Sequence, residues 1–225
     1  MTTLQLGPGV RVVGLFEGYG GLTDGIMRVT GGHLVAYAEH EPASTKSPRP
    51  TQAAARLLAH RYPDVPNLGD VSLIDWGPWR GQVDVIAGGF PCQDVSHAGR
   101  RSGLSAGTRS GLWAEFARAI DEAQPALVVI ENVSGLRSAR AGDPVEVEDE
   151  EARNMEPGTG DLGGSERDDR PILRALGAVL GDLAELGYDG EWISVRASDV
   201  GAPHRRERLF ALAWAPWITD IAGLD

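Results

Sequence analysis

The fold of this chain is decided by the stretch Val83-Asp84-Val85-Ile86-Ala87-Gly88-Gly89-Phe90-Pro91-Cys92-Gln93. Its apolar first half, bounded by glycines, predicts a short buried strand. In an open α/β sheet such a strand delivers the next residues to the carboxyl edge, where ligands bind. Pro91 fixes its own φ and restricts Phe90 to extended backbone, so we expect Cys92 on a stiff turn at that edge. A lone cysteine is more often a small buried hydrophobic residue, so its role depends on what else reaches this edge.

The composition indicates one large domain or two small ones. The chain has 225 residues, 42% of them hydrophobic, and one cysteine, which excludes an internal disulfide. No apolar run approaches the ~18 residues of a membrane span, and the first residues lack the features of a signal peptide. We expect a cytoplasmic protein, with no membrane and no metal among its partners.

Charge is distributed unevenly along the chain. The net charge is −11, and residues 141–170 hold eleven acidic and three basic side chains. The stretch 137–170 therefore predicts a disordered acidic insertion, and a functional acidic arm is the alternative. The rest of the chain is nearly neutral and groups its arginines at 100–101, 109 and 205–208, so it can still meet nucleic-acid phosphates.

Apolar runs that alternate with helical patterns predict an α/β fold with a mostly parallel sheet. We expect strands near residues 10–16, 33–38, 83–87, 126–130, 192–197 and 209–214. We expect helices near 22–29, 51–61, 111–122 and 171–187. The strand at 209–214 is expected to be the antiparallel member.

A glycine turn, Phe16-Glu17-Gly18-Tyr19-Gly20-Gly21, follows the first predicted strand and precedes a predicted helix. Glycines let the backbone approach a ligand closely, and the start of a helix offers free N–H groups, so this turn can cradle a nucleotide. A dinucleotide fingerprint would need a glycine where Thr23 stands, which weighs against nicotinamide and flavin dinucleotides. Taken alone, a tight structural turn is an equally good interpretation.

Three carboxylates follow predicted strands or turns. Glu39 lies about twenty residues after the glycines, where a carboxylate can hold a ribose, although a solvated loop residue is the alternative. Asp70 can accept a hydrogen bond from an exocyclic amine or simply cap a turn. Glu131 follows a fully apolar strand, where a buried carboxyl is costly without a partner or a task.

Four motifs stand in order at predicted strand ends: Phe16-x-Gly18-x-Gly20-Gly21, Gly88-Gly89-Phe90-Pro91-Cys92-Gln93, Glu131-Asn132-Val133 and Arg206-x-Arg208-Leu209-Phe210. On these motifs, the chain resembles the cytosine-5 DNA methyltransferases over roughly residues 10–215. The resemblance implies a Rossmann-like methyltransferase fold. It also implies S-adenosylmethionine (S-adenosyl-L-methionine) as methyl donor, a cytosine in DNA as acceptor, and DNA methylation of the restriction-modification kind.

The resemblance also assigns catalytic roles. Cys92 would be the nucleophile that adds to carbon 6 of cytosine, and Glu131 would contact ring nitrogen 3 and the 4-amino group. Arg206 and Arg208 would hold the base oxygen or a neighbouring phosphate. Because an ordinary thiol with a pKa of ~8.5 is mostly un-ionised at neutral pH, positive charge or helix N–H groups must favour the thiolate.

Ligand contacts are implied in the same way. The implied cofactor contacts are Phe16, Gly18, Gly20, Gly21, Glu39, His40, Asp70, Pro91 and Leu112. The implied DNA contacts are Gln93, Ser96 and Arg109. A base inside a duplex cannot be reached and must be flipped out at a cost of a few kcal/mol, and the polar loop 94–110 is expected to close over it.

The chain departs from the family pattern in three places. His204 stands where the family usually has Gln, the acidic insertion is longer, and no target-recognition domain or final conserved helix is evident after Phe210. We therefore expect residues 1–225 to form a single catalytic domain and hypothesise the catalytic subunit of a split enzyme, with recognition on a second subunit. Three alternatives stay open: a stand-alone enzyme of low specificity, a non-catalytic DNA-modification or regulatory subunit, and an RNA cytosine-5 methyltransferase.

Overall fold

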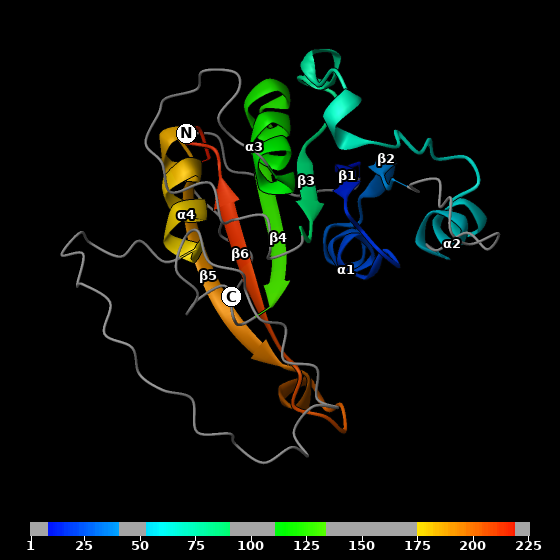
Figure 1. Ribbon diagram of the computed structural model, residues 1–225, viewed down its shortest axis with the longest axis vertical. Coiled ribbons are helices and arrows are strands. Elements are labelled where there is room, and N and C mark those ends of the chain that lie inside the picture. The colour runs from blue at the N-terminus through cyan, green and yellow to red at the C-terminus, as the bar shows by residue number, and fades with distance from the viewer. Residues whose placement is uncertain (1–8, 41–52, 91–110, 134–174, 219–225) are drawn as a thin grey trace, which may run out of the picture.

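A computed structural model of the chain describes residues 9–40, 53–90, 111–133 and 175–218. Six strands form one sheet in the order β2-β1-β3-β4-β6-β5 (Figure 1). Their bounds are β1 Arg11–Leu15, β2 His33–Ala38, β3 Val85–Gly88, β4 Leu127–Val133, β5 Asp189–Arg196 and β6 Glu207–Trp214. The pairs from β2 to β4 are parallel, and β6 runs antiparallel to both of its neighbours. The expected mostly parallel α/β sheet, with its antiparallel strand at 209–214, is therefore confirmed.

Helices cover both faces of the sheet. They are α1 Gly21–Thr30, α2 Ala53–Arg61, α3 Leu112–Ala123 and α4 Ala175–Glu185, with short 3-10 helices η1 Val71–Leu73, η2 Gly77–Trp79 and η6 Ala197–Val200. α1 and α2 lie on one side, and α3 and α4 lie on the other (Figure 1). In the described part of the chain, no helix has the length and apolar character needed to span a membrane.

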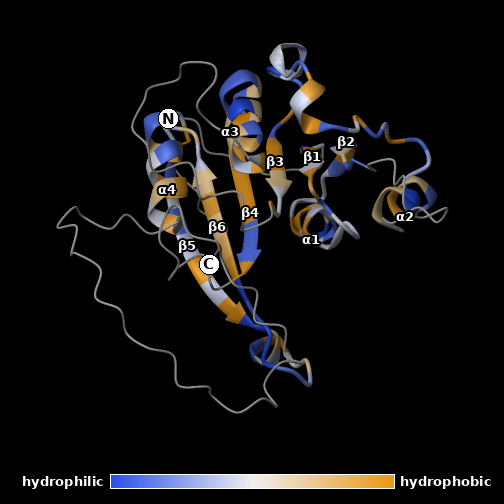
Figure 2. Ribbon diagram, viewed as in Figure 1, coloured by the Kyte–Doolittle hydropathy of each residue, from blue (hydrophilic) through white to orange (hydrophobic). Residues whose placement is uncertain are grey.

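The two faces follow from the period of two in a strand. On β4, Val128 and Ile130 pack with α3 and α4, whereas Leu127 and Val129 pack on the α1 and α2 side. Figure 2 shows the hydrophobic central strands, with β4 turning hydrophilic at its carboxyl end. The central strands are therefore apolar where the helices cover them, and β4 becomes polar at its carboxyl end.

β4 is longer than its apolar run predicts. The strand was expected to end at Ile130, but it continues to Val133 because β6 pairs with it throughout, from Leu127 opposite Trp214 to Val133 opposite Arg208. Glu131 is therefore part of the strand rather than of the turn after it. This placement fixes the direction of its side chain.

Several expected features lie outside the described residues. They are Pro91, Cys92, Gln93, Ser96, Arg109, the loop 94–110 and the acidic stretch 137–170. Their expected roles stay predictions.

Four aromatic side chains tie the sheet edge to α3. Phe90 lies 5.0 Å from Trp113 and 6.2 Å from Phe116, between ring centroids, and Phe16 stacks on Phe116 at 6.4 Å. Trp113 also donates its indole N–H to Asp182 of α4 at 2.7 Å. The residues that follow β1 and β3 are thus anchored to one buried cluster.

We predict that Phe116→Ala lowers the free energy of unfolding by about 3–5 kcal/mol, because it leaves a cavity at the centre of this cluster. Phe116 is fully buried, so little of that loss can be recovered by solvation. Urea unfolding followed by circular dichroism measures the change. Leu73→Ala is the matched control: Leu73 is 84% exposed, and its loss should change stability by no more than about 0.5 kcal/mol. Equal effects of the two variants would contradict the assignment of the core.

Candidate active site at the carboxyl edge of the sheet

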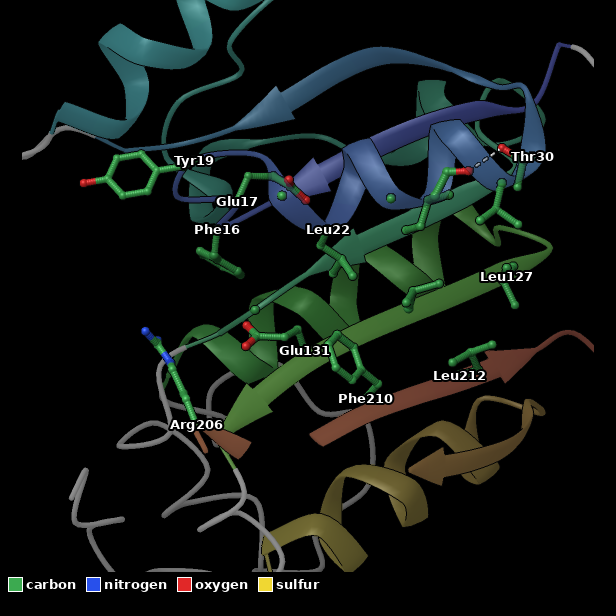
Figure 3. A pocket seen from close by; sticks show the side chains of 16 residues that line it. Phe16, Glu17, Tyr19, Leu22, Thr30, Leu127, Glu131, Arg206, Phe210 and Leu212 are labelled. Atoms are coloured by element: carbon green, nitrogen blue, oxygen red, sulfur yellow. Dashed lines mark hydrogen bonds between the residues drawn. The ribbon is translucent and has the colours of Figure 1, made fainter. Parts of the chain in front are cut away.

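Parallel register brings three strand ends to one edge. Leu15 of β1 pairs with Gly88 of β3, which pairs with Ile130 of β4. The next residues along each strand, Phe16, Gly89 and Glu131, therefore meet at the same place. All three line one cavity of about 760 Å³ (Figure 3), a size typical of a small-molecule site.

The wall opposite α1 is built by one face of β4 and β6. Glu131 pairs with Phe210 and Val133 pairs with Arg208, so side chains at alternate positions of both strands share this face. As a result Leu127, Val129, Glu131, Arg206, Phe210 and Leu212 all line the cavity. Glu131 and Arg206 lie together at one end, whereas Leu127 and Leu212 lie at the other (Figure 3).

The far end of the cavity is apolar and open. α1 contributes Leu22, Ile26 and Val29 to its wall, and Val29 is 75% exposed. The cavity therefore combines a polar end at the carboxyl edge with a long apolar groove between α1 and β6.

Glu131 is paired and tightly surrounded. Its Oε1 lies 2.7 Å from Nε of Arg208. Gly89 permits this position, because a Cβ there would lie 2.9 Å from Oε2 of Glu131. Burial raises the pKa of the Glu131 carboxyl, and the positive charge of Arg206 works against that rise. The structure thus brings Glu131, Arg206 and Arg208 together.

Asn132 has a role that the sequence did not reveal. Its side chain is 4% exposed and donates to the carbonyl of Phe90 at 3.0 Å, and its Oδ1 accepts the N–H of Val133 at 2.8 Å. β4 therefore holds the backbone two residues before Cys92. A buried asparagine beside the Glu131 motif was the available signal, since buried amides need partners.

The glycine turn has the geometry of a cradle. Gly18 and Gly20 have φ of 55° and 78°, and Phe16 adopts φ of 54°. No atom lies within 4 Å of where a Cβ would stand on Gly18 or Gly21, so the backbone is open to a ligand. At Gly20 a Cβ would lie 3.0 Å from Leu58, which shows that this glycine packs against α2 instead.

Glu39 lies beside the turn, and its Oε2 accepts the N–H of Gly18 at 3.2 Å. The side chain of Asn67 fixes it by pairing with both the N–H and the carbonyl of Glu39, each at 3.1 Å. Burial raises the pKa of Glu39. Neither Glu39 nor its neighbour His40 lines the cavity.

Asp70 serves as a cap in the structure. Its Oδ1 accepts both the N–H and the hydroxyl of Ser72, at 3.0 and 2.7 Å, at the start of η1. These bonds lower the pKa of Asp70. Leu112 packs on the core at the start of α3, and like Asp70 it lies outside the cavity lining.

Two cavity residues of the glycine turn were not singled out from the sequence. Tyr19 is 66% exposed at the cavity rim. The Glu17 carboxyl lies between β1 and α1 and accepts the hydroxyl of the buried Thr23 at 2.7 Å.

No group of three or more His, Cys, Asp or Glu side chains in the described segments could hold a metal ion.

Comparison with known proteins places this site in a family. Residues 10–154 match the family described as C-5 cytosine-specific DNA methylase. The type II methyltransferase M.Eco47II of Escherichia coli is 38% identical over 135 residues, which cover 60% of this chain and 30% of that protein. M.NlaIV of Neisseria lactamica is 29% identical over 201 residues, which cover 89% of this chain and 40% of that protein. The chain thus spans less than half the length of these relatives.

Solved structures agree on the fold. A DNA modification methyltransferase encoded within an E. coli prophage aligns with a TM-score of 0.58 and 25% identity over 95% of this chain and 49% of its own. Dnmt2 of Spodoptera frugiperda aligns with a TM-score of 0.59 at 18% identity, over 94% of this chain and 51% of its own, which speaks for the fold alone. Because the family match covers residues 10–154, more than half of the chain, the chain belongs to the C-5 cytosine-specific DNA methylase family.

Proposed function

We propose that this protein transfers a methyl group from S-adenosylmethionine to carbon 5 of cytosine in DNA. The observation that carries the proposal is the position of Glu131, which lines the same cavity as Phe16 and Gly21 of the glycine turn and whose Oε1 lies 2.7 Å from Nε of Arg208. Strand β3, which precedes Cys92, ends at the same edge of the sheet. A DNA substrate of a bacterium or phage would place the reaction in the cytoplasm.

The described residues fit the methyl donor. Gly18 and Gly21 leave backbone open where a ligand would lie, and Phe16 supplies an aromatic wall. Asn67 fixes the backbone of Glu39, and the Glu39 carboxylate, which accepts the N–H of Gly18, would also accept ribose hydroxyls. Asp70 and His40 are proposed contacts at the adenine end, and Pro91 and Leu112 would pack nearby. When bound, S-adenosylmethionine supplies an electrophilic methyl group.

The protein's part in the chemistry is to make cytosine carbon 5 nucleophilic. The thiolate of Cys92 would form a bond to carbon 6, and the displaced electron pair would move into the ring. A proton from the Glu131 carboxyl would neutralise that charge at nitrogen 3, which suits a carboxyl whose pKa burial has raised. Arg206 and Arg208 would orient the base. After transfer the nitrogen 3 proton would return to Glu131, water would take the carbon 5 proton, and the bond from carbon 6 to sulfur would break to release Cys92 as its thiolate.

We also propose that recognition of the DNA sequence resides outside the catalytic fold described here, on a second subunit. The exposed Arg206 and the expected contacts Gln93, Ser96 and Arg109 would serve the flipped base and its phosphates, which carry little sequence information.

We predict that Cys92→Ala abolishes methyl transfer while leaving cofactor and DNA binding intact, because only the nucleophile is lost. Incorporation of tritiated methyl groups into duplex DNA measures transfer, and calorimetry measures binding. His60→Gln, an exposed change on α2, is the control and should keep full activity. Retained transfer by Cys92→Ala would contradict the mechanism, and transfer to tRNA in place of DNA would favour the RNA alternative.

We predict that Glu131→Gln lowers the rate of transfer by about 10²–10⁴-fold, the usual contribution of a positioned acid. The variant keeps a hydrogen-bonding group beside Arg208 but has no proton to give at nitrogen 3. Single-turnover kinetics measure the change. A Glu131→Gln enzyme with the wild-type rate would remove Glu131 from the chemistry.

We predict that sequence-selective methylation requires the second subunit. The assay uses mixed-sequence duplex DNA with the purified chain, alone and together with a co-encoded candidate partner. Selectivity should appear only in the mixture. Robust selective methylation by the chain alone would contradict this part of the proposal.

A further inference from the structure

Within the described residues, one buried carboxyl oxygen of a side chain that lines the cavity has no hydrogen-bond partner. This atom is Oε1 of Glu17, which is inaccessible to solvent, while Oε2 accepts the hydroxyl of Thr23 at 2.7 Å. The side chain folds back over β1, where Gly14 leaves room for it: a Cβ at Gly14 would lie 2.4 Å from Cγ of Glu17. Leaving a carboxylate oxygen buried without a donor is costly unless something else compensates it.

The charged groups around Glu17 do not supply that compensation. Glu39 at the end of β2 and Asp24 on α1 are both acidic and disfavour its ionised form. From α2, Arg61 is paired with Asp24, and the hydroxyl of Tyr62 also donates to Asp24. Among the residues that the structure describes, Thr23 favours the charged carboxylate, through its hydroxyl and its backbone N–H.

We propose that Glu17 determines specificity between methyl donor and product, its carboxylate favouring the cationic sulfonium of S-adenosylmethionine over the neutral thioether of S-adenosylhomocysteine. This inference rests on the proposed function. The glycine turn that carries Glu17 is also the part of the cavity proposed to hold the donor. Methyl transfer removes the positive charge, so the carboxylate would lose its compensation when the product forms, which favours product release.

The protonation state of Glu17 predicts how donor affinity changes with pH. Burial raises the pKa of Glu17 to about 7. A bound cation favours the ionised form and lowers that pKa, so the donor should bind more tightly as the pH rises from 6 to 8 and should release protons on binding. The thioether carries no such charge and should show neither effect through Glu17.

A purely structural role is the alternative. α1 has Gly20 at its N-cap, with no side chain to cap the helix, and Glu17 reaches the third residue of α1 instead. Glu17→Gln separates the two roles, because the amide oxygen can still accept from Thr23 but carries no charge. A structural role alone would leave the ratio of donor to product affinity unchanged.

The test is calorimetry of S-adenosylmethionine and S-adenosylhomocysteine binding to wild type and Glu17→Gln, in buffers of different ionisation enthalpy. At pH 8 we expect the ratio of donor to product affinity to fall about tenfold in Glu17→Gln, which is the equivalent of one pKa unit. On binding the donor at pH 7, the wild type should release roughly 0.4 proton more than Glu17→Gln releases. On binding the product, the two proteins should release the same number of protons. Because the α-amino groups of both ligands also titrate near pH 8, only differences from the variant count.

Glu39→Gln is the matched control, since Glu39 is the neighbouring carboxylate and is proposed to hold the ribose common to both ligands. At pH 8, where Glu17 is already mostly ionised, Glu39→Gln should weaken both ligands by about the same factor. An unchanged affinity ratio in Glu17→Gln, with no difference in proton release, would overturn the inference while leaving the proposed function in place. Failure of the wild type to bind either ligand would overturn both. If Glu17→Gln does not fold, the difference in proton release between donor and product, both bound to the wild type, decides, because both ligands carry the α-amino group.

Discussion

The site depends on the antiparallel pairing of β6 with β4. Seven residue pairs join the two strands, from Leu127 with Trp214 to Val133 with Arg208. This pairing extends β4 beyond its apolar run and puts Arg208 on the same face as Glu131. A parallel strand in that place would need a crossover connection and would bring different residues to the edge. The ion pair is therefore a consequence of topology.

Two acidic side chains with raised pKa values line one cavity, and they differ in the groups that stabilise their negative charge. Glu131 lies 2.7 Å from Arg208 and near Arg206, whereas Glu17 has, in the described part of the chain, the two donors of Thr23 and no cation. Groups whose environments separate their ionisation in this way often have separate tasks. Here one faces the expected position of the base, and the other lies in the turn expected to hold the donor.

Much of the fold could be predicted from the sequence, because the strands of a buried sheet are apolar and glycines mark some helix ends, such as Gly20 and Gly31 at the two ends of α1. The six strands, four helices and antiparallel β6 were all expected within a few residues. The convergence of Glu131, Arg206 and Arg208 was expected from the family resemblance. That Glu131 belongs to a strand was not expected, because this depends on its pairing with Phe210, about 80 residues further along the chain. The contacts of Asn132 and Glu17 could not be predicted either, since each depends on backbone from another segment: the carbonyl of Phe90, and the space left by Gly14.

The most direct test of the central claim uses duplex DNA in which the target cytosine carries fluorine at carbon 5. Fluorine cannot leave as the carbon 5 proton does, so the bond between the protein and carbon 6 should persist after methyl transfer. With S-adenosylmethionine present, intact-protein mass spectrometry should show a stable adduct, and peptide mapping should place it on Cys92. Methyl transfer to ordinary cytosine without any adduct on the fluorinated DNA, or an adduct on another residue, would contradict a reaction centred on Cys92 and Glu131.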